Sequence, residues 1–196
     1  MAKGKIIIIS GPSGSGKTTL HKKLMASPKF KSKLAKSVSV TTRPKRKGER
    51  SGRDYFFVSP ERFLYKKRSN HFLESEKVFG NHYGTPRAHV EKLLRQGKHV
   101  LMCIDVKGAR VVREKFPKAV TIFIKAPSLS VLASRLRERQ SEGKSVVRLR
   151  LETARKELKE AKKYKHVVVN DRLEAAYRKL ELIIKGEIKP SSQKQP

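Results

Sequence analysis

The amino-acid sequence predicts an α/β fold in which a parallel sheet is flanked by helices. Apolar stretches rich in β-branched residues alternate with longer amphipathic stretches along most of the 196 residues, an order typical of strands joined by right-handed helical crossovers. The first apolar stretch, at 6–9, is a run of four isoleucines, which suits a strand buried on both faces. A glycine-rich loop follows this strand directly, and a helical pattern follows the loop.

The glycine-rich loop reads GPSGSGKTT at residues 11–19 and fits the pattern G-x-x-x-x-G-K-[ST]. Glycines let the backbone turn tightly and bring its N–H groups close to a ligand, and a helix that begins near Gly16 directs its positive end at the same anion. Lys17 adds a point charge and Thr18 a hydroxyl that can bind Mg²⁺. We therefore expect the phosphates of a nucleoside triphosphate to be held by Gly11, Pro12, Ser13, Gly14, Ser15, Gly16, Lys17, Thr18 and Thr19.

The other elements follow from hydrophobic periodicity and capping signals. Further strands are expected at 37–41, 72–78, 99–104, 119–125 and 166–170. Helices are expected at 18–26, 60–67, 86–97, 108–116, 128–140, 146–164 and 173–185. Ser59-Pro60 and Thr85-Pro86 each combine a cap with a proline at the first helical position. In the helix at 146–164, one face is expected to carry Leu149, Thr153, Ala154, Leu158 and Ala161.

Composition limits the classes of function. The 48 Lys and Arg against 17 Asp and Glu give a net charge of +31, which attracts polyanions and allows non-specific binding to them. Tryptophan is absent and the other aromatic residues are scattered, so no specific nucleic-acid partner is expected. The single cysteine, Cys103, fits a reducing compartment, and the six histidines lack metal-ligand spacing. Without a signal-peptide core or a stretch that could span a bilayer, a cytoplasmic protein without a membrane partner is expected.

A polar, arginine-rich stretch interrupts the alternation between about residues 37 and 84, and we expect a second substrate there. Arg43, Arg46, Tyr55 and Tyr83 suit a phosphate monoester, because guanidinium and phenol groups donate hydrogen bonds to its oxygens.

Glu74 in the same stretch is suited to reading a purine base. Its carboxylate can accept from two adjacent donors, and guanine offers N1–H and N2–H₂, whereas adenine presents an acceptor at N1. The hydroxyls of Ser39 and Thr85 can donate to guanine O6. The residues alone leave open a second interpretation, in which Glu74 is a solvated residue of an edge strand.

Arginines late in the chain are candidates for neutralising a triphosphate. Arg135 and Arg139 are four residues apart and share a helical face, and Arg150 returns from the far side of a charged connection. Arg137 and Arg148 are expected to point to the exterior, and the residues alone leave open that all five are surface charge.

These segments occur in the order and spacing of the guanylate kinase family, which the chain resembles from residue 5 to about residue 185. The segments that carry the resemblance are GPSGSGKTT, SVSVTTRPKRKGE, GRDYFFV, FLE, GNHYGTP, IDVKGA, RLRERQ and VNDRLEAAY. The resemblance implies a P-loop NTPase-type parallel sheet with flanking helices, an inserted nucleoside-monophosphate-binding domain and a small lid. The core then comprises 1–36, 87–127 and 151–187, the GMP-binding domain 37–86 and the lid 128–150, while 188–196 are expected to form a disordered tail.

The resemblance also implies an enzyme that transfers the γ-phosphate of ATP to GMP or dGMP, with Mg²⁺ as cofactor. It implies that ATP binds at the glycine-rich loop and near Asn170, and that the metal binds at Thr18 and Asp105. The GMP phosphate is assigned to Arg43, Arg46, Tyr55 and Tyr83, and the base to Ser39, Glu74 and Thr85. Positioning and positive charge supply most of the catalysis of phosphoryl transfer, here expected from Lys17, Arg43, Arg135, Arg139 and Arg150.

Two positions depart from the family's pattern. Thr85 stands where serine is frequent and keeps the hydroxyl. Cys103-Ile104-Asp105 stands where the family usually has Asp-Ile-Asp. The missing aspartate usually helps to bind the guanine amino group, so a lower affinity or base selectivity is expected, and Cys103 itself is expected to be a small buried core thiol. The absence of this aspartate leaves a kinase of another small phosphorylated acceptor as an alternative function. Two further alternatives are a non-catalytic scaffold of the same fold and a nucleic-acid-binding protein that uses the +31 charge.

Overall fold

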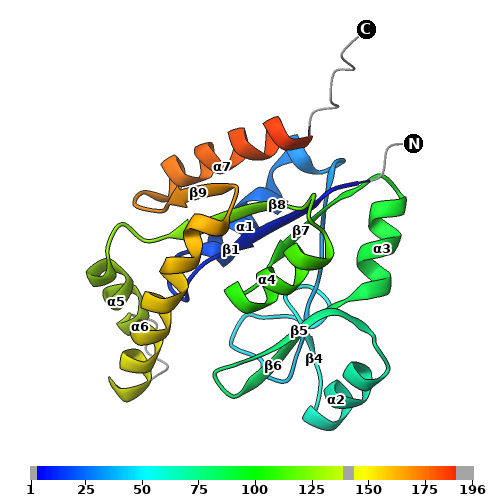
Figure 1. Ribbon diagram of the computed structural model, residues 1–196, viewed down its shortest axis with the longest axis horizontal. Coiled ribbons are helices and arrows are strands. Elements are labelled where there is room, and N and C mark those ends of the chain that lie inside the picture. Colours follow the sequence, from blue (N-terminus) through cyan, green and yellow to red (C-terminus); the bar gives the residue numbers. More distant parts are fainter. Residues whose placement is uncertain (1–3, 139–143, 189–196) are drawn as a thin grey trace, which may run out of the picture. The chain divides into compact units, whose positions relative to one another are not determined.

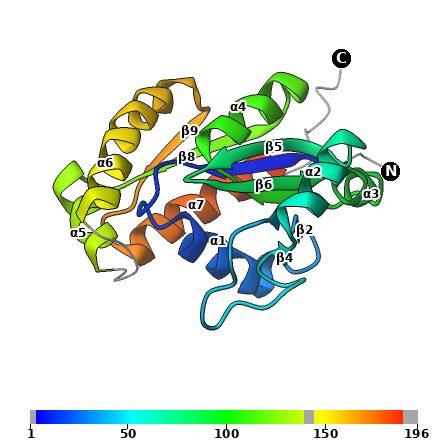
Figure 2. The same cartoon turned by 90° about the horizontal axis from the view of Figure 1, so that it is seen from below.

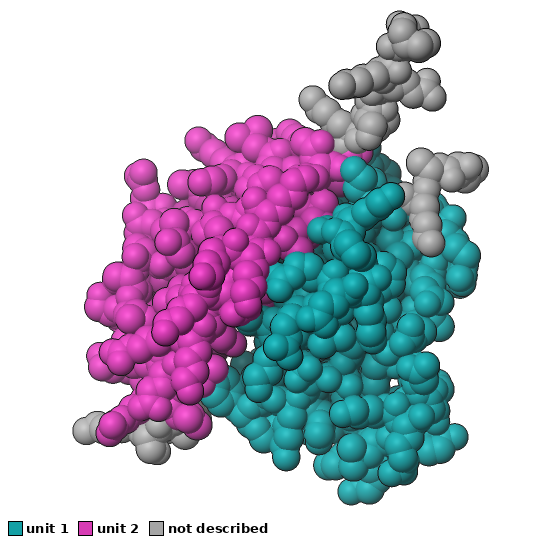
Figure 3. Space-filling model, viewed as in Figure 1, with its two compact units in different colours: residues 1–8, 31–119 teal, residues 9–30, 120–196 magenta. Residues whose placement is uncertain are grey.

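A computed structural model describes residues 4–138 and 144–188. The chain forms two compact units, unit 1 (residues 1–8 and 31–119) and unit 2 (residues 9–30 and 120–196) (Figure 3). The division falls within strand β1 (Ile6–Ser10), so both units contain a part of it. Each unit combines helices with strands (Figure 1).

Unit 1 contains the strand order β2-β7-β1. Strands β2 (Leu34–Lys36) and β7 (His99–Cys103) are parallel, with Leu34 opposite His99. Helix α3 (Arg87–Arg95) packs against β7. The central residues of β7 are completely or almost completely buried. This agrees with the apolar strand that the sequence predicts at 99–104.

Unit 1 also carries a second sheet with the order β4-β3-β6-β5. Its strands are β3 (Val40–Thr41), β4 (Phe56–Phe57), β5 (Phe72–Val78) and β6 (Asn81–Pro86). Strands β5 and β6 form an antiparallel hairpin, with helices α2 (Pro60–Arg68) and α3 beside it (Figure 2). A small core of Val40, Phe63 and Phe72 holds this sheet, and the two phenylalanine rings stack 4.7 Å apart.

Several expectations for unit 1 need correction. No strand is predicted at 81–86, but this segment forms strand β6. Thr85 lies in this strand instead of capping a helix. Pro86 is the N-cap of α3. The β-prone run expected at 37–41 is a strand only at its last two residues. The cap at Ser59 is confirmed, because its hydroxyl accepts from the backbone N–H of Arg62 at 3.3 Å.

Unit 2 contains the strand order β1-β8-β9. Strands β8 (Val120–Lys125) and β9 (His166–Val169) are parallel, with Ile122 opposite His166. Helix α1 (Lys17–Ala26) packs against α7 (Leu173–Ile188), and α7 packs against β9. A short 3₁₀ helix, η1 (Pro28–Phe30), follows α1. The parallel sheet with flanking helices is thus confirmed.

Helices α5 (Leu129–Arg137) and α6 (Lys144–Lys159) pack on each other, and α6 continues into the 3₁₀ helix η2 (Glu160–Lys163). Their shared core contains Ala126, Leu132, Leu136, Val147 and Ala154. The buried face expected for this helix is wrong at Leu149, which is 54% exposed. Ala154 of the expected face is buried, and Val147, which was not predicted, is buried with it, while Leu151 is partly buried against the same core.

Parts of the predicted organisation lie outside the described residues. These are the lid connection at 139–143, including Arg139, and residues 189–196 of the tail, whereas the tail expected at 188 is wrong for Ile188, which ends α7. The division into core, GMP-binding domain and lid stays a prediction. Among the helices in the described ranges, none has the length and apolar character needed to cross a membrane.

Candidate active site

The glycine-rich loop in unit 2 needs its glycines. Gly11, Gly14 and Gly16 have positive φ angles of 137°, 84° and 90°, which glycine adopts without steric cost. A Cβ atom on Gly11 would lie 2.1 Å from the carbonyl oxygen of Ile124, and one on Gly16 would lie 2.1 Å from Nδ2 of Asn170. The loop therefore combines tight turns with a close approach to the chain that surrounds it.

Lys17 begins helix α1 and folds back over the loop. Its Nζ donates to the carbonyl oxygens of Gly11 at 2.5 Å and Pro12 at 2.7 Å. The N-cap position is Gly16, so no side chain caps α1, and the first turn of this described helix carries no acidic side chain. The positive end of the helix is therefore suited to an external anion.

The predicted ATP-binding and lid residues of unit 2 gather around the same loop. Buried Asn170 donates from Nδ2 to the carbonyl oxygen of Ser15 at 2.9 Å. Arg135 donates to the backbone carbonyls of Asn170 at 3.0 Å and Asp171 at 3.3 Å. Arg150 donates from Nη1 to the hydroxyl of Ser13 at 3.2 Å.

The remaining arginines of this region and two threonines of the loop are exposed. Arg137 and Arg148 are exposed, as predicted. Thr18 and Thr19, in the first turn of α1, also expose their side chains.

In unit 1, Glu74 and Thr85 form a buried pair. They lie opposite each other on β5 and β6, are 5% and 0% exposed, and the Thr85 hydroxyl donates to Oε1 of Glu74 at 2.5 Å. Burial raises the pKa of Glu74 to about 8, and the nearby charge of Asp105 adds to this shift. Strand β5 does lie at the edge of its sheet, but Glu74 is not solvated, because helix α4 (Val106–Lys115) packs on this strand.

Asp105 caps the helix that covers Glu74. Its Oδ1 accepts from the backbone N–H groups of Lys107 at 2.8 Å and Gly108 at 3.1 Å. The residue predicted to organise Mg²⁺ thus has one carboxylate oxygen engaged by the first turn of α4. Its charge also acts on Glu74 within the same unit.

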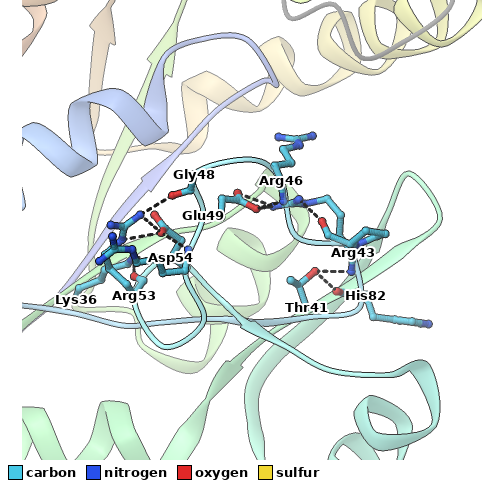
Figure 4. A network of polar contacts seen from close by, with 11 residues as sticks. Lys36, Thr41, Arg43, Arg46, Gly48, Glu49, Arg53, Asp54 and His82 are labelled. Carbon is cyan, nitrogen blue, oxygen red and sulfur yellow. Dashed lines mark hydrogen bonds and ion pairs between the residues drawn. The ribbon is translucent and has the colours of Figure 1, made fainter.

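Arg43 is held by Glu49, and Figure 4 shows this pair in the loop that precedes β4. Nη2 of Arg43 donates to Oε1 and Oε2 of Glu49 at 2.8 and 2.9 Å. Burial opposes charge in both groups, but their mutual hydrogen bond raises the pKa of Arg43 and lowers the pKa of Glu49. The guanidinium lies 5.5 Å from the ring centre of Tyr55, within the range of a cation–π contact. The Tyr55 ring in turn lies 6.0 Å from that of Tyr83.

The same loop carries a second set of contacts (Figure 4). Asp54 is buried, and its Oδ2 accepts from Nε of Arg53 at 2.8 Å and from the backbone N–H of Arg50 at 3.0 Å. Lys36 donates from β2 to the carbonyl oxygen of Arg53. These bonds fix the loop on which Arg43 stands, whereas the side chain of Arg46 is exposed.

Cys103 and Ser39 are half-buried. The expectation of a buried core thiol at Cys103 is therefore not met. Burial raises the pKa of Tyr55 above its ordinary value, and the charge that Cys103 can carry adds to the shift. Cys103 thus lies near the phenol of Tyr55, at the end of β7.

Sequence reasoning missed two residues that shape this site. Glu49 holds Arg43, and Gly108 lies against the carboxyl group of Glu74. Both residues lie in segments that carry the family resemblance. The ion pair of Glu49 with Arg43 and the contact of Gly108 with Glu74 depend on the folded chain, so they leave no periodic signal in the sequence. Among the described residues, no cluster of three or more His, Cys, Asp or Glu side chains could hold a metal ion.

The glycine-rich loop that opens a helix after a buried strand, together with the arginines and tyrosines of unit 1, defines the class of P-loop kinases that act on small phosphorylated acceptors.

A family model described as guanylate kinase matches residues 3–187. Guanylate kinase of Clostridium tetani is 42% identical over 187 residues, which cover 95% of this chain and 88% of that protein. Guanylate kinase of Rickettsia prowazekii is 40% identical over 185 residues, covering 94% and 92% of the two chains. The crystal structure of guanylate kinase from Anaplasma phagocytophilum superposes with a TM-score of 0.80 at 34% identity, covering 97% of this chain and 89% of that one. The chain belongs to the guanylate kinase family.

Proposed function

We propose that the chain transfers the γ-phosphate of ATP to GMP, with ATP bound by residues of unit 2 and GMP bound by residues of unit 1. This activity is the one that the family's name describes. The observation that carries the assignment of the acceptor is the buried pair of Glu74 and Thr85, which offers a carboxyl group and a hydroxyl to one ligand. The complete glycine-rich loop with Lys17 supports a catalytic protein over a scaffold.

The ATP phosphates bind at the loop of residues 11–19 in this proposal. The turn geometry of the loop and the positive end of α1 support it. Lys17 exchanges its bonds to the loop carbonyls for bonds to the transferring phosphate. Arg135, Arg150 and the undescribed Arg139 neutralise charge that develops during transfer, and Asn170 adjoins the adenine.

Mg²⁺ is the proposed cofactor, and the residues at hand fit it. The ion typically keeps several waters and takes only one or two protein ligands beside the substrate phosphates, which agrees with the exposed hydroxyl of Thr18 in the first turn of α1. Asp105 can contribute through Oδ2, since Oδ1 accepts from the α4 backbone. When bound, the ion would neutralise charge on the phosphate oxygens.

The GMP phosphate binds among Arg43, Arg46, Tyr55 and Tyr83. The gathering of the Arg43 guanidinium with the two tyrosine rings supports this assignment. Before GMP binds, Glu49 holds the guanidinium group of Arg43 in one orientation. Less side-chain conformational freedom of Arg43 is therefore lost when the phosphate of GMP binds.

The guanine base is read by Glu74, with Thr85 and Ser39 as hydroxyl partners. A buried carboxyl group rejects a base that cannot supply its hydrogen bonds, because the group would be left unpaired in a site of low dielectric. Cys103 lies near Tyr55, and the buried pair of Glu74 and Thr85 supports retained selectivity for guanine. dGMP carries the same base and is accepted through the same contacts.

Two broader properties belong to the proposal. The chain is cytoplasmic, and its positive charge binds polyanions only non-specifically.

A matched pair of substitutions on β5 tests this proposal. Glu74→Gln keeps the volume and removes the acceptor charge, and it should raise the KM for GMP by about tenfold to a hundredfold while the KM for ATP changes little. Glu76→Gln, two residues further along the same strand, is the control; because the charge of Glu76 adds to the raised pKa of Glu74, this variant should leave the KM for ATP unchanged and should not raise the KM for GMP. Equal KM values for GMP in the two variants would contradict the assignment of Glu74.

A further inference from the structure

We infer that Gly108 is a positioning residue for guanine recognition, because only a residue without a side chain lets the carboxyl group of Glu74 lie against the first turn of α4. The inference rests on the proposed function, in which Glu74 reads the base. Gly108 lies three residues after the N-cap Asp105 and is buried.

The distances leave no room for a side chain at this position. A Cβ atom on Gly108 would lie 2.7 Å from Oε2 of Glu74 and 3.2 Å from its Cδ. It would also lie 3.6 Å from Oδ2 of Asp105, which is an ordinary contact. The conflict is therefore with Glu74 alone, and something must shift if a methyl group is added.

Burial and a hydrogen bond restrict how far the carboxyl group of Glu74 can move aside. Its carboxyl group is buried, and Oε1 accepts from the Thr85 hydroxyl at 2.5 Å. The neighbouring backbone is also tied to α4, because Nζ of Lys115 donates to the carbonyl oxygen of Leu73 at 2.9 Å. A methyl group on Gly108 would thus turn the carboxyl group away from Thr85 and from the position it offers to a base.

Neither backbone conformation nor helix propensity accounts for a glycine here. Gly108 is absent from the residues of the described chain with positive φ, so alanine can adopt its conformation. Glycine is also a poorer helix former than alanine. The close approach of the Glu74 carboxyl group is the remaining physical reason for glycine at this position.

Gly108→Ala tests the inference, with Gly186→Ala as the matched control. Gly186 is also helical, in α7, but a Cβ there meets nothing within 4 Å. We expect Gly108→Ala to raise the KM for GMP by about tenfold or more while the KM for ATP stays within about twofold of its original value. Gly186→Ala should leave both values unchanged. A KM for GMP that stays within about twofold in Gly108→Ala, or an equal rise for ATP, would overturn the inference.

A rescue variant separates displaced chemistry from a damaged fold. Glu74→Asp shortens the side chain by one methylene, so the double variant Gly108→Ala/Glu74→Asp withdraws the carboxyl group from the added methyl. The double variant should bind GMP more tightly than the product of the two single effects predicts, and should recover any melting temperature lost in Gly108→Ala. If the effects of the two single substitutions on GMP binding and melting temperature are strictly additive in the double variant, the inference is overturned. This holds even if Gly108→Ala alone folds poorly.

The failure of this inference is distinguishable from the failure of the proposed function. If the unchanged protein does not phosphorylate GMP, the proposed function fails. If it does so and Glu74→Gln impairs GMP binding, but Gly108→Ala has no effect, only the role of Gly108 is refuted.

Discussion

Raising the pH from 6.5 to 8 should tighten the binding of GMP but not of ATP, because Glu74 can accept from both N–H donors of guanine only as a carboxylate. Burial raises the pKa of Glu74 to about 8. In the absence of substrate the group is therefore mostly protonated at neutral pH, when it presents an O–H donor to the N–H donors of the base. Binding of GMP then requires the proton to leave.

The size of the effect follows from the ionised fraction. With a pKa of about 8, this fraction is about 3% at pH 6.5 and about half at pH 8. The apparent dissociation constant equals the intrinsic one divided by the competent fraction, so the KM for GMP should fall by about fifteenfold over this interval. The phosphate of the nucleotide has its second pKa near 6 and changes its charge little over the same range.

Initial rates at saturating ATP over this pH range measure the effect. Glu74→Gln is the control, and its KM for GMP should lose the pH dependence that the unchanged chain shows. A KM for GMP that is constant between pH 6.5 and pH 8, or a dependence retained by Glu74→Gln, would refute the reasoning.

Three further substitutions have expected outcomes. Lys17→Ala should lower kcat by about a hundredfold or more with the circular dichroism spectrum unchanged, because the lost charge faces the transferring phosphate; a smaller loss contradicts the role of the loop. Glu49→Gln should raise the KM for GMP by less than Arg43→Ala does, since it weakens the hold on the guanidinium without removing it; an equal rise in the KM for ATP would argue against an acceptor site. Cys103→Asp should change the KM values for GMP and IMP by the same factor, because Cys103 lies near Tyr55; an effect confined to GMP would place Cys103 at the guanine amino group.

Features encoded by contiguous residues were predictable from the sequence. The four isoleucines and the glycine-rich loop predict β1 and the start of α1, because a buried strand and a phosphate loop are both local patterns. Strand β5 at 72–78 is predicted with its observed bounds. The family segments lead to the correct family.

Features that depend on neighbours in space were not predictable in the same way. The Thr85-Pro86 signal suggests a helix cap, but the fixed φ of proline also suits a strand end, and pairing with β5 decides the outcome. Leu149 was assigned to the buried face of a helix whose contact with α5 sets a different rotation. The pKa of Glu74 and the close approach of Gly108 arise from α4 packing on β5, which no local pattern contains.

Phosphoryl transfer from ATP to individual nucleoside monophosphates tests the central claim most directly. Initial rates of ADP formation would be measured in a coupled assay with GMP, dGMP, AMP, UMP and CMP as acceptors. We expect kcat/KM for GMP to exceed that for AMP by about a hundredfold or more, because the buried carboxyl group of Glu74 is matched by guanine and left unpaired by adenine. Equal values for GMP and AMP, or no transfer to any of these acceptors by the folded protein, would contradict it.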